Sequence, residues 1–274
     1  MRLLKRLADD SLILTDDLEE EDIPPYAILS HTWGAKEEEV TYTDFREGKD
    51  KDKRGYRKLL FCADQARRDG QTHFWIDTCC IDKSDHVELN TAITSMFDWY
   101  AKATECYVYL SDVGSDASDT GNTDQSTWQS QFRKCRWLTR GWTLQELLAP
   151  KVVKFYDQHG TLLGDKTTLE NHICEITGIP AAALRGRSLT SFTIEERLSW
   201  QRTRKTKKPE DAAYSLSGIC GVAMIPIYGE GKAKAMARLH KEIDDVLKGE
   251  RWWIVATAVT LCLSVYSSTD LHRS

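Results

Sequence analysis

The chain has 274 residues, 41% of them hydrophobic, so it is long enough to bury a large core as one domain or as one domain with an appendage. Its formal net charge of -5 gives no overall attraction to phosphate backbones, which argues against nucleic acid as a partner. The eight cysteines are scattered without the spacing of a metal site, and the N-terminus is charged too early for a signal peptide. We therefore predict a reducing, cytoplasmic setting and no bound metal.

Four short apolar segments predict buried strands, at residues 26–30, 73–77, 106–110 and 152–156. Between the first three, apolar residues recur at helical spacing over 56–66 and 89–100, which predicts two helices. The order strand, helix, strand, helix, strand is typical of a parallel sheet with right-handed crossovers. The segment from Ser111 to Ser130 is rich in small polar residues and is predicted to be a mobile surface loop.

After Asp157 the pattern changes to helices with short connections, at residues 169–176, 194–200, 209–219 and 231–247. We predict an α/β core over 1–160, a helical extension over 161–248 and an apolar tail of uncertain structure over 249–274. Within this tail, residues 252–266 are apolar but fall short of the roughly 20 residues needed to span a bilayer. A packed segment is therefore favoured over a membrane contact, which stays the alternative.

Polar residues follow the first two predicted strands. They are Ser30, His31, Trp33, Asp77 and Asp82. In an open α/β sheet the ligand crevice lies beyond the carboxyl ends of the strands, so we expect these side chains to gather there. The two aspartates suit a cation or a ribose hydroxyl, although capping and turn formation explain them as well. The histidine and tryptophan could stack on a base or a nicotinamide ring, although a packed, hydrogen-bonded histidine is the commoner outcome.

Glu146 is the carboxylate of a motif that combines two tryptophans, two arginines and an apolar run over residues 136–150. It lies four residues after Trp142 in a segment that predicts a short helix, so both side chains share one helical face. A carboxylate beside an indole in a partly dry pocket has its charged form disfavoured, which makes it a useful proton acceptor near neutral pH. The alternative is an ion pair with Arg136 or Arg140 that only fixes the helix, and this segment alone favours the ion pair.

Several familiar motifs are absent. The segment 229–232 resembles a phosphate-binding loop, but the first glycine of that pattern falls at Pro226, so a turn that opens the last helix is the better interpretation. No Gly-x-Gly-x-x-Gly or Gly-x-Ser-x-Gly pattern supports a Rossmann dehydrogenase or a serine hydrolase. A thiol nucleophile made of Cys80 and His31 ranks low. The basic segment 202–208 is interpreted as a solvated loop.

The ordered series of motif blocks resembles the fungal heterokaryon-incompatibility (HET) domain. The blocks are Pro25–Gly34 (PYAILSHTWG), Phe74–Asp82 (FWIDTCCID), Glu88–Tyr100, Arg140–Glu146 (RGWTLQE), Arg197–Trp200 (RLSW), Glu210–Leu216 (EDAAYSL) and Ile227–Gly231 (IYGEG). The resemblance covers residues 1–247 and is strongest to the N-terminal part of vegetative-incompatibility proteins that continue into a nucleotide-binding NACHT module and WD repeats. A more distant similarity links HET domains to TIR domains. It implies a TIR/flavodoxin-like α/β fold, a mostly parallel sheet flanked by helices, with a C-terminal helical extension.

The resemblance also implies a function. HET proteins act in non-self recognition and programmed cell death, a form of fungal innate immunity. In the enzymatic TIR relatives, a glutamate that matches Glu146 serves NAD cleavage. Glu146 would then be catalytic, Ser30, His31, Trp33, Asp77, Asp82 and Trp142 would bind NAD as substrate, and no cofactor would be required.

The expected partners are further copies of the chain or other HET or TIR-like proteins. Two alternatives stay open: a non-catalytic signalling and assembly module, and an inactive fragment of a larger receptor. With the resemblance included, the catalytic and the structural interpretations of Glu146 are about level.

Overall fold

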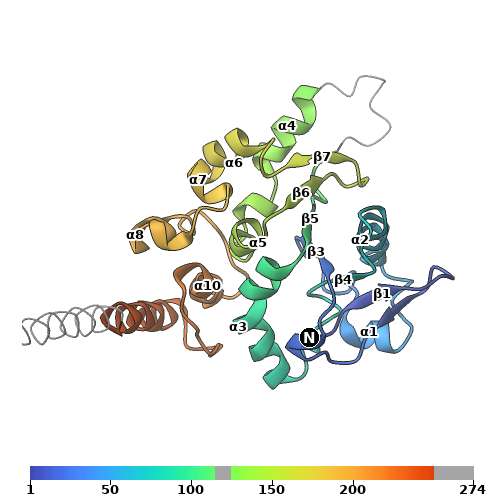
Figure 1. The fold of residues 1–274 in the computed structure, drawn as a ribbon, viewed down its shortest axis with the longest axis horizontal. Coiled ribbons are helices and arrows are strands. Elements are labelled where there is room, and N and C mark those ends of the chain that lie inside the picture. The colour runs from blue at the N-terminus through green and yellow to red at the C-terminus, as the bar shows by residue number, and fades with distance from the viewer. Residues whose placement is uncertain (115–124, 250–274) are drawn as a thin grey trace, which may run out of the picture.

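Seven strands form a single mixed sheet in the order β2-β1-β4-β3-β5-β6-β7, in a computed structural model that describes residues 1–114 and 125–249 (Figure 1). The four central strands run parallel, and they are β4 (His73–Trp75), β3 (Tyr26–His31), β5 (Glu105–Tyr109) and β6 (Val153–Tyr156). These are the four strands that the apolar segments predict, so the predicted parallel core is confirmed. Numbered in chain order, the central strands are arranged 2-1-3-4, as in flavodoxin-like folds, and the TIR/flavodoxin-like α/β class is confirmed.

The three outer strands are antiparallel to their neighbours, and the sequence analysis did not predict them. They are β1 (Leu4–Arg6), β2 (Leu12–Leu14) and β7 (Leu162–Asp165). Each has three or four residues and is partly exposed, and even the wholly apolar β2 is shorter than the run of four or more residues that marks a buried strand. By contrast, all six residues of β3 are buried because the central sheet is covered on both faces.

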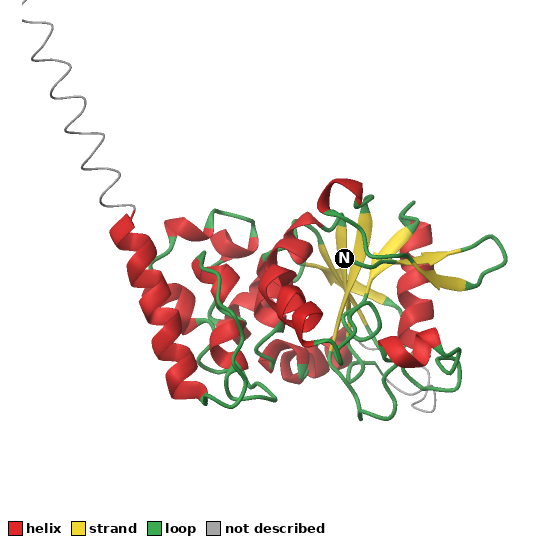
Figure 2. Cartoon of the chain, turned by 90° about the horizontal axis from the view of Figure 1, so that it is seen from below, coloured by secondary structure: helices red, strands yellow, loops and turns green. Residues whose placement is uncertain are grey.

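Helices lie on both faces of the sheet. The helix α2 (Tyr56–Arg68) covers one face, whereas α3 (His86–Lys102) and α5 (Thr143–Leu148) lie on the other (Figures 1 and 2). The two predicted helices are thus confirmed. The second one starts earlier than predicted because the side chain of Asp85 caps it, accepting hydrogen bonds from the backbone amides of Val87 and Glu88. Short elements before β4 are η1 (Glu20–Asp22) and α1 (Tyr42–Arg46).

The predicted loop from Ser111 to Ser130 is only partly a loop. Its residues 115–124 lie outside the described part of the chain, but the helix α4 (Gln125–Lys134) begins within it, so the loop prediction is wrong at its C-terminal end. The reason is an aromatic pair at helical spacing. Trp128 packs beside Phe132, which is fully buried and lies against Phe155 with 5.6 Å between the ring centroids.

The helical extension contains helices in all four predicted stretches. They are α6 (Glu170–Thr177), α8 (Ile194–Ser199), α9 (Asp211–Tyr214), α10 (Ser217–Cys220) and a helix over 232–249. Two further short helices, α7 (Ala181–Leu184) and η3 (Leu189–Ser191), lie between the predicted stretches. Gly229 and Gly231 have φ values of 96° and 81°, so they form a turn before the last helix, as predicted. The predicted apolar tail lies outside the described residues. Across 1–114 and 125–249, no helix is long and apolar enough to cross a bilayer.

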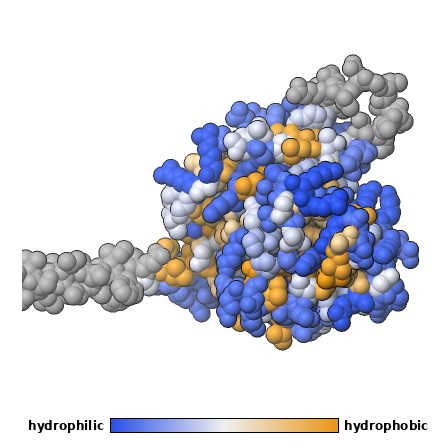
Figure 3. Space-filling view, turned by 45° about the vertical axis from the view of Figure 1, so that its right-hand side comes forward, coloured by the Kyte–Doolittle hydropathy of each residue, from blue (hydrophilic) through white to orange (hydrophobic). Residues whose placement is uncertain are grey.

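The cysteines of the described chain are core residues with free thiols. Six of these seven are buried, and Cys174 is half-buried. Figure 3 shows one face on which hydrophilic side chains predominate and apolar ones form small, separate groups.

Candidate active site

A cavity of about 310 Å³ lies at the carboxyl ends of β3 and β4. The loops after these strands contribute His31, Trp33 and Asp77, and α3 contributes an apolar wall. The start of α5 and the segment 207–228 of the extension supply the remaining residues. This is the edge of the sheet at which open α/β folds bind ligands, and the volume is at the lower end of the range for small-molecule pockets.

Glu146 reaches this cavity from α5, and its carboxyl is almost completely removed from solvent. Ser30, on β3, donates a hydrogen bond from its Oγ to Glu146 Oε2, and Trp137 donates from its indole Nε1 to Ser30 Oγ over 2.6 Å. Burial raises the pKa of Glu146 to about 8, against the opposing effect of the Ser30 hydrogen bond. The carboxyl is therefore mostly protonated at neutral pH when the cavity is empty.

The backbone that places Glu146 is held by a threonine and a buried arginine. The short 3-10 helix η2 (Trp137–Thr139) ends just before α5, and Thr143 donates from its Oγ1 to the carbonyls of Trp137 at 2.6 Å and Arg140 at 2.8 Å. Arg204 donates to the Arg140 carbonyl and to Thr143 Oγ1, both over 2.9 Å. These bonds fix the angle at which α5 enters, and with it the direction of the Glu146 side chain.

Neither of the two arginines expected as alternative partners forms an ion pair with Glu146. Arg136 points to another carboxylate, with its Nε 3.7 Å from Asp112. Arg140 lines the cavity, but within the described chain no arginine, lysine or histidine nitrogen lies within 4.0 Å of the Glu146 carboxylate. The charges of Arg140 and Arg204 act on it only at longer range, where they lower its pKa less than burial raises it.

Replacing Trp137 by phenylalanine is expected to destabilise the fold by about 1–3 kcal/mol, because Ser30 Oγ loses its buried donor. Trp75→Phe is the matched control: Trp75 is equally buried, but its indole nitrogen has no hydrogen-bond partner to lose. Urea denaturation of both variants measures the difference. Equal losses in the two variants would show that the indole of Trp137 acts through its volume alone.

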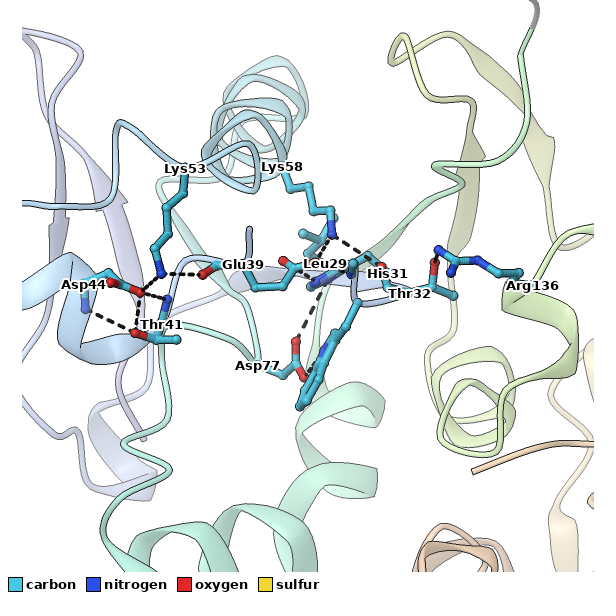
Figure 4. Close-up of polar contacts among 12 residues, drawn as sticks. Leu29, His31, Thr32, Glu39, Thr41, Asp44, Lys53, Lys58, Asp77 and Arg136 are labelled. Carbon is cyan, nitrogen blue, oxygen red and sulfur yellow. Dashed lines mark hydrogen bonds and ion pairs between the residues drawn. The ribbon is translucent and has the colours of Figure 1, made fainter. Parts of the chain in front are cut away.

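A network of charged side chains lies beside the cavity (Figure 4). His31 sits between two carboxylates, with its Nε2 3.6 Å from Glu39 and its Nδ1 4.0 Å from Asp77. Although burial alone would raise it, the neighbouring His31 and Lys58 hold the pKa of Glu39 well below its usual range. Trp33 donates from its indole nitrogen to Asp77 Oδ2 over 2.9 Å. The network thus fixes Asp77 and the Trp33 ring at the cavity wall.

The structure gathers most of the predicted site residues. His31, Trp33, Asp77, Trp142 and Glu146 all line the cavity. Ser30 lies behind Glu146 and reaches the cavity only through their hydrogen bond.

Asp82 is not among the lining residues. Its carboxylate accepts hydrogen bonds from the backbone amide of Ser84, over 2.9 Å, and from the Ser84 hydroxyl, as in the turn formation that was its alternative. A ligand role for Asp82 stays a prediction, because its side chain does not line the cavity.

Further polar residues of the cavity were not predicted to line it. Lys83 lies in the loop after β4, Arg140 precedes α5, and Lys207, Lys208, Asp211 and Tyr228 come from the extension. The available signals were the basic segment 202–208 and the two downstream blocks 210–216 and 227–231. Nothing in their spacing indicates that they fold back onto the sheet.

Asp211 is a second carboxyl at the cavity. Tyr228 donates from its hydroxyl to Asp211 Oδ1 over 3.0 Å. Burial raises the pKa of Asp211, and a hydrogen bond from Trp142 opposes that rise. The turn that carries Tyr228 is anchored by Glu210, whose Oε1 accepts from the amides of Gly229 at 2.9 Å and Gly231 at 3.0 Å. The extension is therefore built into the wall of the cavity.

Over 1–114 and 125–249, no three or more His, Cys, Asp or Glu side chains are arranged to hold a metal ion. The cavity instead combines aromatic rings, cations and two carboxyls whose pKa values are raised.

Comparison with known proteins identifies relatives of this chain. The family model described as heterokaryon incompatibility protein (HET) matches residues 26–122. Vegetative incompatibility protein HET-E-1 of Podospora anserina is 52% identical over 243 residues, which are 89% of this chain. The aligned region spans only 18% of that protein. No solved structure matches the chain.

Proposed function

This chain carries a heterokaryon-incompatibility domain, and on that premise we propose that it is an effector of fungal vegetative incompatibility, in which non-self recognition ends in programmed cell death. We propose further that its cavity cleaves NAD when copies of the chain associate. The observation that carries this second step is the buried Glu146 carboxyl, which lies in an aromatic-lined cavity at the ligand-binding edge of the sheet.

The reaction releases nicotinamide from the ribose. The bond between the ribose C1′ and the ring nitrogen breaks, and both electrons pass to that nitrogen, which neutralises the pyridinium charge. The sugar gains oxocarbenium character, which a carboxylate stabilises, as in glycoside hydrolysis. Water then bonds to C1′ through its oxygen and gives a proton to Glu146. The products are nicotinamide and ADP-ribose.

The raised pKa of Glu146 suits this sequence of events. An opposite charge within a few ångströms favours the ionised form of a carboxyl, and the nicotinamide ring of NAD is cationic. Substrate binding would therefore drive a proton off Glu146 and leave a carboxylate facing the reacting carbon. Trp33 and Trp142, which line the same cavity, offer aromatic faces for the cationic ring.

A second candidate is a non-catalytic module that signals by assembling with other HET or TIR-like domains. The hydrogen-bond chain from Trp137 through Ser30 to Glu146 favours it, because it joins η2, β3 and α5 in the way that a structural carboxyl would. Under this candidate, a folded variant without the carboxylate keeps its toxicity. The two candidates therefore differ in what the carboxylate contributes to cell death.

Nicotinamide release is the test of the enzymatic proposal. Purified protein, incubated with NAD at increasing protein concentration or with a crowding agent, is expected to yield nicotinamide and ADP-ribose in equal amounts by chromatography. The rate per molecule should rise with concentration because the proposed activity requires self-association. Intact NAD at every concentration would rule out cleavage by this chain alone and leave the assembly function.

A further inference from the structure

The basic segment 202–208 is largely the exposed loop that its composition indicates, but it is fixed in place at Arg204 and Lys205. Its backbone pairs with the residues before α5: Lys205 donates to the Thr139 carbonyl over 2.7 Å, and Gly141 donates to the Lys205 carbonyl over 2.9 Å. Arg204 is buried beneath this pairing and is bonded to the start of α5. The end of the segment, Lys207 and Lys208, is thereby held at the cavity, which both residues line.

The lysines at the cavity rest mainly on aromatic rings. Lys208 Nζ lies 3.4 Å from the centroid of the Tyr228 ring, and Lys83 Nζ lies 3.8 Å from that of Trp33. Asp77 is the carboxylate partner of Lys83, at 3.8 Å. Among the described residues, no carboxylate oxygen lies within 4.0 Å of the ammonium groups of Lys207 or Lys208. Burial lowers the pKa of Lys83, and the charge of Lys207 lowers it further.

The acidic groups of the cavity only partly balance these cations. Burial raises the pKa of Glu146 to about 8, and Asp211 accepts a hydrogen bond from the Tyr228 hydroxyl. Asp77 is already engaged by the Trp33 indole and faces His31. The wall formed by Lys83, Lys207 and Lys208 therefore has positive charge to offer an anion, and we call these three residues the lysine wall.

We propose that the lysine wall binds a phosphate or pyrophosphate group, so that the site accepts nucleotides and discriminates against nucleosides that carry no phosphate. The choice of a nicotinamide nucleotide rests on the proposed function, whereas the phosphate preference rests on the lysine wall itself. Because the two extension lysines are exposed, the diphosphate of a dinucleotide would lie at the mouth of the cavity. The cavity volume then needs to hold only one end of the dinucleotide.

Calorimetric titration with three probes tests the proposal. Nicotinamide riboside, nicotinamide mononucleotide and NAD carry no, one and two phosphates, and chromatography after each titration measures how much of each probe has been cleaved. Wild-type protein is expected to bind the mononucleotide at least about tenfold more tightly than the riboside, with an affinity that falls as salt is added. The Lys207→Ala/Lys208→Ala variant should lose that preference and keep its affinity for the riboside.

Arg202→Ala/Lys205→Ala is the matched control, because it removes two exposed cations of the same segment that do not line the cavity. It should bind all three probes like the wild type. Lys83→Gln, which alters the wall from the sheet side, should weaken mononucleotide binding independently of the extension. Circular dichroism verifies the fold of each variant.

The outcomes separate this inference from the proposed function. Equal wild-type affinities for the riboside and the mononucleotide, or an unchanged mononucleotide affinity in the Lys207→Ala/Lys208→Ala variant, would overturn the lysine wall as a phosphate site. Phosphate-dependent binding of NAD without cleavage would support the wall and remove the enzymatic proposal. Cleavage of NAD in which the lysine substitutions change neither binding nor rate would support the enzymatic proposal and overturn the lysine wall as a phosphate site.

Discussion

Glutamine in place of Glu146 is expected to lower the rate of NAD cleavage by at least about 100-fold while the protein stays folded. Positioned acid–base groups contribute roughly 10²- to 10⁴-fold to catalysis. Glutamine cannot ionise, so the variant has no carboxylate that could accept the proton from water. Glutamine keeps an oxygen that can accept the Ser30 hydrogen bond, so the link between β3 and α5 survives. Initial rates of nicotinamide release at matched protein concentration measure the effect.

Glu242→Gln is the control for this experiment, since it neutralises an exposed carboxylate on the last described helix. It should cleave NAD like the wild type. In the wild type, kcat/KM is expected to rise about tenfold per pH unit and to level off near pH 8, because the free enzyme must lose the Glu146 proton. Turnover by a folded Glu146→Gln protein at the wild-type rate would assign the carboxyl a structural role.

Raising the pH from about 4.5 to about 8 is expected to destabilise the wild type relative to Glu146→Gln by about 1.4 kcal/mol per pH unit. In the unfolded chain the carboxyl loses its proton near pH 4.5, whereas in the folded protein burial keeps it protonated until about pH 8. Between these values the folded state binds more protons, so its stability falls as the pH rises. The accumulated difference is on the order of 5 kcal/mol.

Urea denaturation at half-unit pH steps measures this difference. Subtracting the curve of Glu146→Gln from that of the wild type removes the titration of the groups that both proteins share. The difference should be flat below pH 4.5, fall steadily up to pH 8 and be flat again above it. Parallel curves over the whole range would show that Glu146 ionises normally in the folded protein.

The central sheet was predictable because its strands carry their own signal. All six residues of β3 are buried, and the first four of them, Tyr26–Leu29, form an apolar run that is visible in the sequence. The outer strands β1, β2 and β7 form by pairing with the edges of the central sheet. Their few residues carry no comparable sequence pattern. The helix α4 was missed because two aromatic residues within a polar segment decide its packing.

The site was predictable to the extent that it follows single strands. Parallel strands end at one edge, so His31, Trp33 and Asp77 were expected to meet, and Glu146 stood out by its motif. Lys207 and Asp211 could not be placed in this way. Their position depends on backbone pairing between residues 139–141 and 205, which are far apart in the chain and show no sequence pattern for that contact.

The protonation of Glu146 itself tests the account most directly. Nuclear magnetic resonance of protein carrying carbon-13 in its glutamate side chains follows the carboxyl carbon of Glu146 through a pH titration, and its absence in Glu146→Gln assigns the signal. We predict a midpoint near pH 8 in the free protein and a lower midpoint when the cavity is saturated with a nicotinamide nucleotide. A midpoint near 4.5 in both states would contradict the account.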